Sequence, residues 1–168
     1  MKDKKQETRN KKQETRSKKH LTSRGIMGLV RAEIELINTE DVGLVRRGFL
    51  KDTEIRHIKV NALVDSGAYM MVVPEAVRLQ LGLAIVAHKV AEYANGQIEE
   101  VPICGPLDIH FSNRETTVRA MVTGNEVLLG AIPMEDMDVL IDPRSQQLIV
   151  NPDHPTMPQM IVKRVPNS

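Results

Sequence analysis

Aromatic residues, cysteines and long apolar runs are what this chain has least of. Its 168 residues include two Tyr, two Phe and no Trp, so we expect no aromatic platform for stacking nucleic-acid bases. A single cysteine, Cys104, excludes a disulfide within the chain and therefore a disulfide-held secreted fold. No stretch reaches the roughly 20 apolar residues of a membrane-spanning helix, and none follows the N-terminal charges as in a signal peptide. These absences predict a cytoplasmic protein without membrane contacts.

The composition supports one modest core. Apolar residues make up 41% of the chain, and nine Met help aliphatic side chains to fill an interior that has few aromatics. Domains commonly span about 100 to 200 residues. The length therefore leaves room for one domain with a tail, and it excludes two complete lobes.

The net charge of +1 is the sum of a basic N-terminal segment and an acidic remainder. Residues 1–24 contain ten Lys or Arg against three Asp or Glu, and they include the tandem units KKQETRN and KKQETRS without an apolar position. Such a segment has nothing to bury, so residues 1–24 are predicted to be a basic, disordered tail and residues 25–168 a folded domain. A solvated tail is the favoured interpretation, and binding to nucleic acid is expected only through this tail.

Short alternating or apolar segments predict an all-β fold: one closed barrel with one or two short helices. NTED (38–41) is interpreted as a turn, PEAVRLQLG (74–82) as a short helix and PMEDM (133–137) as a helical turn. The predicted strands are 30–36, a segment ending at 64, 85–94, 97–101, 107–111, 116–122, 127–129, 139–142 and 147–150.

The motif ALVDSGA, residues 62–68, is the sharpest candidate site. A buried strand there runs directly into Asp65, so the carboxylate is held rigidly at the end of the strand. Ser66 offers a hydroxyl that can lock the turn, and Gly67 allows close approach of the backbone. Asp-Ser-Gly is also ordinary turn chemistry, so the tripeptide alone does not decide the function.

About thirty residues later, Asn95 and Gly96 give the strongest hairpin signal in the chain. A third motif, VLLGA (127–131), is an apolar run that a glycine ends. The three motifs, in this order, resemble the retropepsin-like aspartic proteases, which include bacterial relatives of the retroviral enzymes. The resemblance covers roughly residues 28–150 and implies a single-lobe acid-protease barrel that needs no metal and no cofactor.

The resemblance assigns roles position by position. Asp65 matches the catalytic aspartate, Ser66 the hydroxyl residue that bonds across the dimer, and Gly67 and Ala68 the remainder of the active-site turn. Residues 93–98 match the flap that closes over substrate, which makes Tyr93, Asn95 and Gly96 candidate substrate-binding residues. Leu128, Leu129 and Gly130 match the segment that packs beside the turn.

One departure from the family pattern concerns substrate positioning. Tyr69 stands where many retroviral members carry an acidic residue that holds the substrate backbone. A single lobe also supplies only one carboxylate, so the expected enzyme is a homodimer that pairs two copies of Asp65 and cleaves peptide or protein substrates. The alternative is a lobe of the same fold that serves as a non-catalytic dimerisation or peptide-binding module.

Other chemistries receive less support from the sequence. Ser66 lacks the GxSxG surroundings of a hydrolase nucleophile, and Cys104 is interpreted as a small buried side chain. The acidic residues 135, 136 and 138 are interpreted as a solvated helix face rather than a cation site. The histidines show no zinc-binding spacing; they are His20, His57, His88, His110 and His154.

Overall fold

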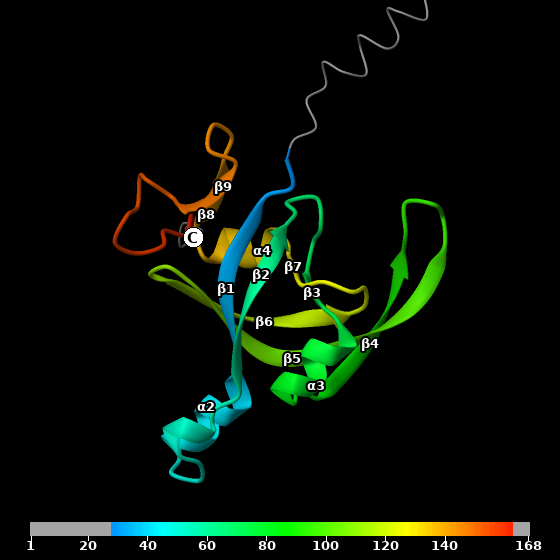
Figure 1. Ribbon diagram of the computed structural model, residues 1–168, viewed down its shortest axis with the longest axis vertical. Coiled ribbons are helices and arrows are strands. Elements are labelled where there is room, and N and C mark those ends of the chain that lie inside the picture. Colours follow the sequence, from blue (N-terminus) through cyan, green and yellow to red (C-terminus); the bar gives the residue numbers. More distant parts are fainter. Residues whose placement is uncertain (1–27, 163–168) are drawn as a thin grey trace, which may run out of the picture.

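The structure is a computed structural model that describes residues 28–162 (Figure 1). The predicted basic tail, residues 1–24, lies outside the described residues. The strands are β1 (Arg31–Asn38), β2 (His57–Val64), β3 (Met71–Val73), β4 (Ile85–Glu92), β5 (Ile98–Phe111), β6 (Arg114–Val122), β7 (Leu128–Leu129), β8 (Val139–Asp142) and β9 (Gln147–Val150). The helices are α2 (Thr39–Arg46), α3 (Glu75–Leu81), α4 (Ala131–Asp136) and the short 3₁₀ helix η1 (Asp52–Glu54).

Seven strands form one sheet that closes on itself. Their order is β1-β2-β7-β3-β6-β5-β4, and β1 also pairs with β5. Six strands therefore make a ring, β4 lies outside it paired with β5, and β8 and β9 form a separate two-stranded sheet. This architecture confirms the predicted all-β class and closed barrel.

The core fills the ring with aliphatic side chains, as the shortage of aromatics requires. Leu36, Met71, Leu107, Ile109 and Leu129 are fully buried, and they come from four different strands of the ring. Along β1 and β6 buried residues alternate with more exposed ones, because side chains of a strand point to opposite faces of the sheet.

The segment NTED starts a helix, where the sequence predicted a turn. Asn38 is the N-cap of α2, and its side-chain oxygen accepts hydrogen bonds from the backbone N–H groups of Glu40 and Asp41. Asp41 is buried and accepts three hydrogen bonds from Arg56, which lower its pKa. The helix therefore depends on a partner 15 residues away, and the local pattern could not show that partner.

Two further predictions needed adjustment. The segments 97–101 and 107–111 belong to one long strand, β5, whose pairing with β6 shifts register between Cys104 and Leu107. Pro74 is the N-cap of α3 and not its first residue, whereas Gly82 ends that helix with a φ of 62°, as expected. Within residues 28–162, no helix has both the length and the apolar character to cross a membrane.

Candidate active site

Asp65 follows directly after β2 in a tight and exposed turn. The backbone N–H of Gly67 donates to Asp65 Oδ1 over 2.8 Å, and the N–H of Ala68 donates to the Asp65 carbonyl over 3.2 Å. A Cβ at position 67 would lie 3.1 Å from Asp65 Oδ1, so glycine leaves room for this close contact. The turn thus aims one carboxylate outward and fixes its orientation.

Strand β7, which comes much later in the chain, is hydrogen-bonded to the first residue of this turn. The N–H of Asp65 donates to the carbonyl of Leu129 over 3.0 Å. In register, β2 pairs in parallel with β7 so that Leu63 lies opposite Leu128, and β7 also pairs with β3. The strands before and after the Asp65 turn are therefore joined through one central strand.

The start of α4 holds the far side of the turn. The N–H of Ala131 donates to the carbonyl of Ala68 over 2.7 Å, and the N–H of Ile132 donates to the carbonyl of Tyr69 over 3.1 Å. Gly130 makes this approach possible, because a Cβ there would lie 2.2 Å from the Met70 carbonyl oxygen. The structure thus brings the two predicted motifs, residues 65–68 and 128–130, into direct contact.

The Asn95-Gly96 motif lies in a hairpin of β4 and β5. Residues 93–97 lie between the two strands, where the sequence predicted only Asn95 and Gly96 between them. The N–H of Tyr93 donates to the carbonyl of Gln97, the N–H of Gly96 donates to the Tyr93 carbonyl, and the Asn95 side chain accepts from the N–H of Gln97. Gly96 has a φ of 79°, as this type of loop requires.

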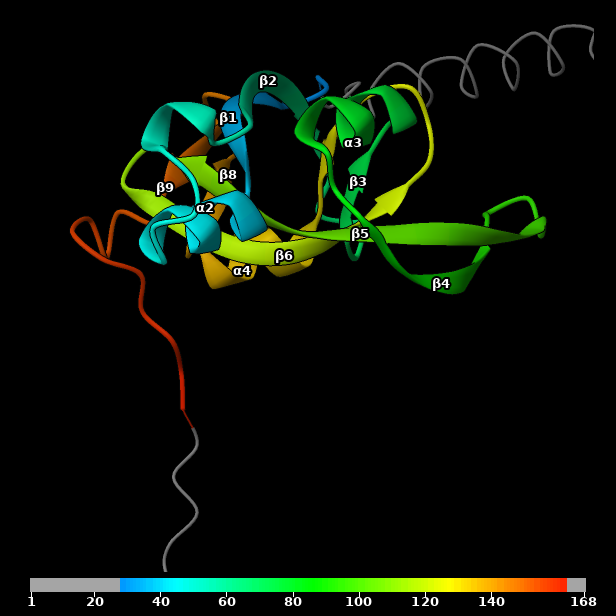
Figure 2. The ribbon, with the colours of Figure 1, turned by 90° about the horizontal axis from the view of Figure 1, so that it is seen from below.

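The hairpin and the Asp65 turn lie on the same side of the lobe. Figure 1 shows both the β4–β5 hairpin and the loop between β2 and β3 rising on one side, with α2 on the opposite side. Figure 2 shows the hairpin extending well beyond the rest of the lobe. The Tyr93 hydroxyl donates to Glu99 Oε2 over 3.1 Å, so this ring is attached to its own hairpin.

The structure shows exposed apolar residues near the Asp65 turn, of which the sequence had singled out only Tyr69, and that for its place in the family pattern. Leu29 is 74% exposed, Tyr69 72% and Ile132 37%. Leu29 precedes Val30, whose carbonyl accepts from the N–H of Val64, and Ile132 and Tyr69 are hydrogen-bonded to each other. We call Leu29, Tyr69 and Ile132 the apolar rim. These residues are recognised as one surface only by their exposure in the structure, and exposure cannot be read from the sequence.

Other reactive groups lie away from this turn. Cys104 is fully buried, and burial raises the pKa of its thiol to about 11, which is consistent with its predicted role as a core side chain. Among residues 28–162, no group of three or more His, Cys, Asp or Glu side chains has an arrangement that could hold a metal ion.

The comparisons with known proteins concern the fold. No family model and no curated protein matches the chain. Solved structures that match include the solution structure of simian foamy virus (mac) protease, with 18% identity, a TM-score of 0.40 and coverage of 62% of this chain and 90% of that one. They also include the crystal structure of the retroviral protease-like domain of Ddi1 from Leishmania major, with 14% identity, a TM-score of 0.45 and coverage of 74% and 90%.

Proposed function

We propose that this chain is an aspartic endopeptidase whose active form is a homodimer with Asp65 of both copies at one site. The observation that carries the proposal is the Asp65 turn itself. An exposed carboxylate accepts a hydrogen bond there from the N–H of Gly67, and hydrogen bonds to β7 and to the start of α4 hold the turn itself. A catalytic group needs rigid support of this kind.

The apolar rim supports the homodimer. Leu29, Tyr69 and Ile132 lie on segments that adjoin the Asp65 turn, and they expose apolar surface to water in the single lobe. A two-fold axis through the Asp65 turn would bury these side chains against their own copies and bring the two carboxylates together. Burial of apolar surface contributes about 25 cal/mol per Å², so the rim can offset part of the repulsion between the acids.

The chemistry follows from the proximity of two like charges. Two carboxylates a few ångströms apart share one proton, because a doubly ionised pair is unfavourable. The ionised Asp65 removes a proton from a water whose oxygen attacks the peptide carbonyl carbon. The protonated Asp65 donates its proton to the carbonyl oxygen, and a proton then passes to the leaving nitrogen as the C–N bond breaks. The reaction consumes one water and yields a carboxyl and an amine terminus.

The hairpin at Tyr93–Gln97 supplies the second part of the proposed site. An extended peptide between the Asp65 turns and two such hairpins would hydrogen-bond to their backbones in the manner of an added strand. Closure of the hairpins would also exclude bulk water from the reacting carbonyl. Tyr69 stands in place of the acidic residue of many retroviral members, so this position supplies no carboxylate to the substrate backbone.

The test is cleavage of a mixed peptide library by the purified full-length chain, with and without a transition-state-mimicking inhibitor of aspartic proteases. Asp65→Asn should abolish inhibitor-sensitive cleavage, whereas Asp52→Asn, which changes another exposed aspartate in η1, should leave it intact. Full activity of Asp65→Asn would refute the assignment. A folded wild-type dimer that binds peptides without cleaving them would support the non-catalytic module instead.

A further inference from the structure

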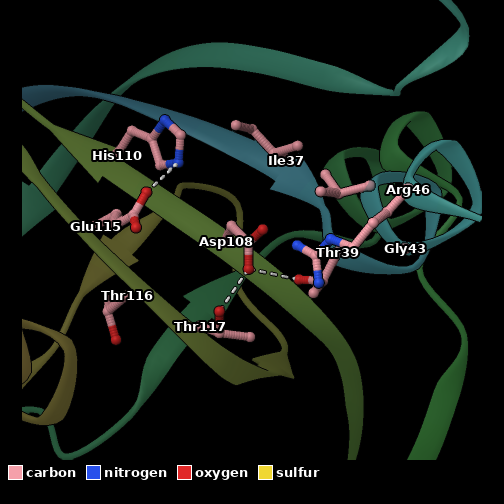
Figure 3. A pocket seen from close by; sticks show the side chains of 10 residues that line it. Ile37, Thr39, Gly43, Arg46, Asp108, His110, Glu115, Thr116 and Thr117 are labelled. Carbon is pink, nitrogen blue, oxygen red and sulfur yellow. Dashed lines mark hydrogen bonds and ion pairs between the residues drawn. The ribbon is translucent and has the colours of Figure 1, made fainter. Parts of the chain in front are cut away.

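A cavity of about 650 Å³ lies on the side of the lobe opposite the Asp65 turn, between α2 and the outer face of β5 and β6 (Figure 3). Strand β1 runs from the Asp65 turn to the cavity. Its first residues pair with the end of β2, beside the Asp65 turn, and its last residue, Asn38, caps α2. Eight extended residues span roughly 25 Å. The cavity is lined by Ile37, Thr39, Val42, Gly43, Arg46, Asp108, His110, Glu115, Thr116 and Thr117.

Asp108 is held in a fixed orientation at the wall formed by β5. Its Oδ1 accepts hydrogen bonds from Thr39 Oγ1 over 2.8 Å and from Thr117 Oγ1 over 2.6 Å. The two hydroxyls come from α2 and from β6, so three elements fix this one carboxylate, as Figure 3 shows. Both bonds go to the same oxygen, which leaves Oδ2 available to a donor in the cavity.

Arg46 faces the same cavity from the last turn of α2. The ion pairs within residues 28–162 include neither Arg46 nor Asp108. Two opposite charges thus line one cavity, and no nitrogen–oxygen contact of 4 Å or less joins them. Ile37 and Val42 add apolar surface to the lining. The arrangement is complementary to a molecule that carries a cationic group, an apolar middle and an anionic group.

We propose that this cavity binds a short peptide with free ends, with its terminal ammonium group at Asp108 and its terminal carboxylate at Arg46. A ligand of one charge fits less well, because a lone anion meets Asp108 and Glu115 and a lone cation meets Arg46. The volume lies within the roughly 300–1,000 Å³ typical of small-molecule sites. The site is distinct from the Asp65 turn, and the proposal does not depend on peptidase activity.

Calorimetric titration of trialanine into the full-length chain tests this assignment. The chain carries Asp65→Asn, so that hydrolysis cannot consume the probe. N-acetylated and C-amidated trialanine each lack one terminal charge, and each should bind at least about tenfold more weakly than the free peptide because a charge-assisted hydrogen bond is lost. Equal binding of the free and blocked peptides would overturn the proposal.

Two variants assign each end of the peptide to its partner. Asp108→Asn keeps an oxygen that accepts from both threonines, and in this variant acetylation should no longer weaken binding. Arg46→Gln should in the same way remove the effect of amidation, because a double-mutant cycle measures the coupling between the substituted side chain and the blocked end of the peptide. Arg47→Gln and Asp52→Asn are matched controls outside the cavity lining and should bind like the parent.

Two further outcomes would count against a free-ended peptide. Tighter binding of acetyl-lysine amide than of trialanine would mean that the cavity takes a basic side chain of a protein partner. Absence of measurable heat at about 10 mM trialanine would show that the separated charges bind no peptide of this class.

Discussion

The imidazole Nδ1 of His154 lies 2.6 Å from Asp138 Oδ2, and this contact attaches the C-terminal segment to the residue before β8. Asp138 also accepts from Asn151 Nδ2 over 2.8 Å and from the backbone N–H of Gln159 over 3.1 Å. These bonds, led by that of Asn151, lower the pKa of Asp138 to about 2. The carboxylate is thus the common acceptor for the segment that follows β9.

Acidification should therefore release this segment. A carboxyl whose pKa falls from 3.8 to about 2 on folding stabilises the folded state above pH 3.8, and this contribution is lost as the pH drops through about 2. In urea unfolding at successive pH values, the wild-type chain should lose stability toward pH 2 more steeply than Asp138→Asn. Asp153→Asn, in the same segment, serves as control and should follow the wild type. Parallel curves for wild type and Asp138→Asn would contradict the prediction.

Replacing Gly130 by Ala should destabilise the lobe by about 2 kcal/mol or more, because the new Cβ would overlap the backbone carbonyl of Met70. The matched control is Gly43→Ala in α2, where a Cβ would meet nothing within 4 Å. That change should stabilise the chain by up to about 1 kcal/mol, since alanine favours helix. Urea unfolding of both variants gives the comparison, and equal stabilities would show that α4 does not hold the Asp65 turn closely.

Cys104 should react slowly with thiol reagents in the folded chain. Burial raises its pKa from 9.0 to about 11, so at pH 8 the thiolate is about a hundredfold rarer than in an unperturbed thiol. Labelling with a chromogenic disulfide should be slow in buffer and fast in urea. Rapid labelling without denaturant would mean that the core around β5 opens readily.

Ile132→Glu should weaken dimerisation if the apolar rim is the interface. The side chain is partly exposed at the start of α4, so the single lobe tolerates a charge there, whereas a two-fold contact would bring two like charges together. Phe49→Glu is the control, because Phe49 is an even more exposed apolar residue but follows α2 on the other side of the lobe. Sedimentation velocity over a range of concentrations should show a monomer for Ile132→Glu alone.

Peptidase activity should depend on the equilibrium between monomer and dimer. Specific activity of the wild-type chain is expected to rise with protein concentration, and Ile132→Glu should shift this rise to higher concentration. Constant specific activity of a chain shown to be monomeric would exclude the shared site.

Local signals predicted most of the strands and the Asp65 turn, because alternation and Asp-Ser-Gly act over a few residues. They did not predict α2, since Asn38 is equally suited to a turn and to a helix N-cap, and the deciding contact is with Arg56. Nor could they show that Gly130 lies against Met70, 60 positions away. The apolar rim and the charged cavity likewise depend on segments that only the closed sheet brings together.

The position of β4 outside the ring has a mechanical consequence. Among the described strands, β4 hydrogen-bonds to β5 alone. The outer part of the hairpin is therefore attached to the barrel only through β5. It can bend without breaking a pairing of the barrel, so its movement costs only local contacts. Amide hydrogens of residues 88–100 should therefore exchange with solvent through local unfolding of the hairpin. Those of β2 and β6 should exchange only when the whole lobe unfolds.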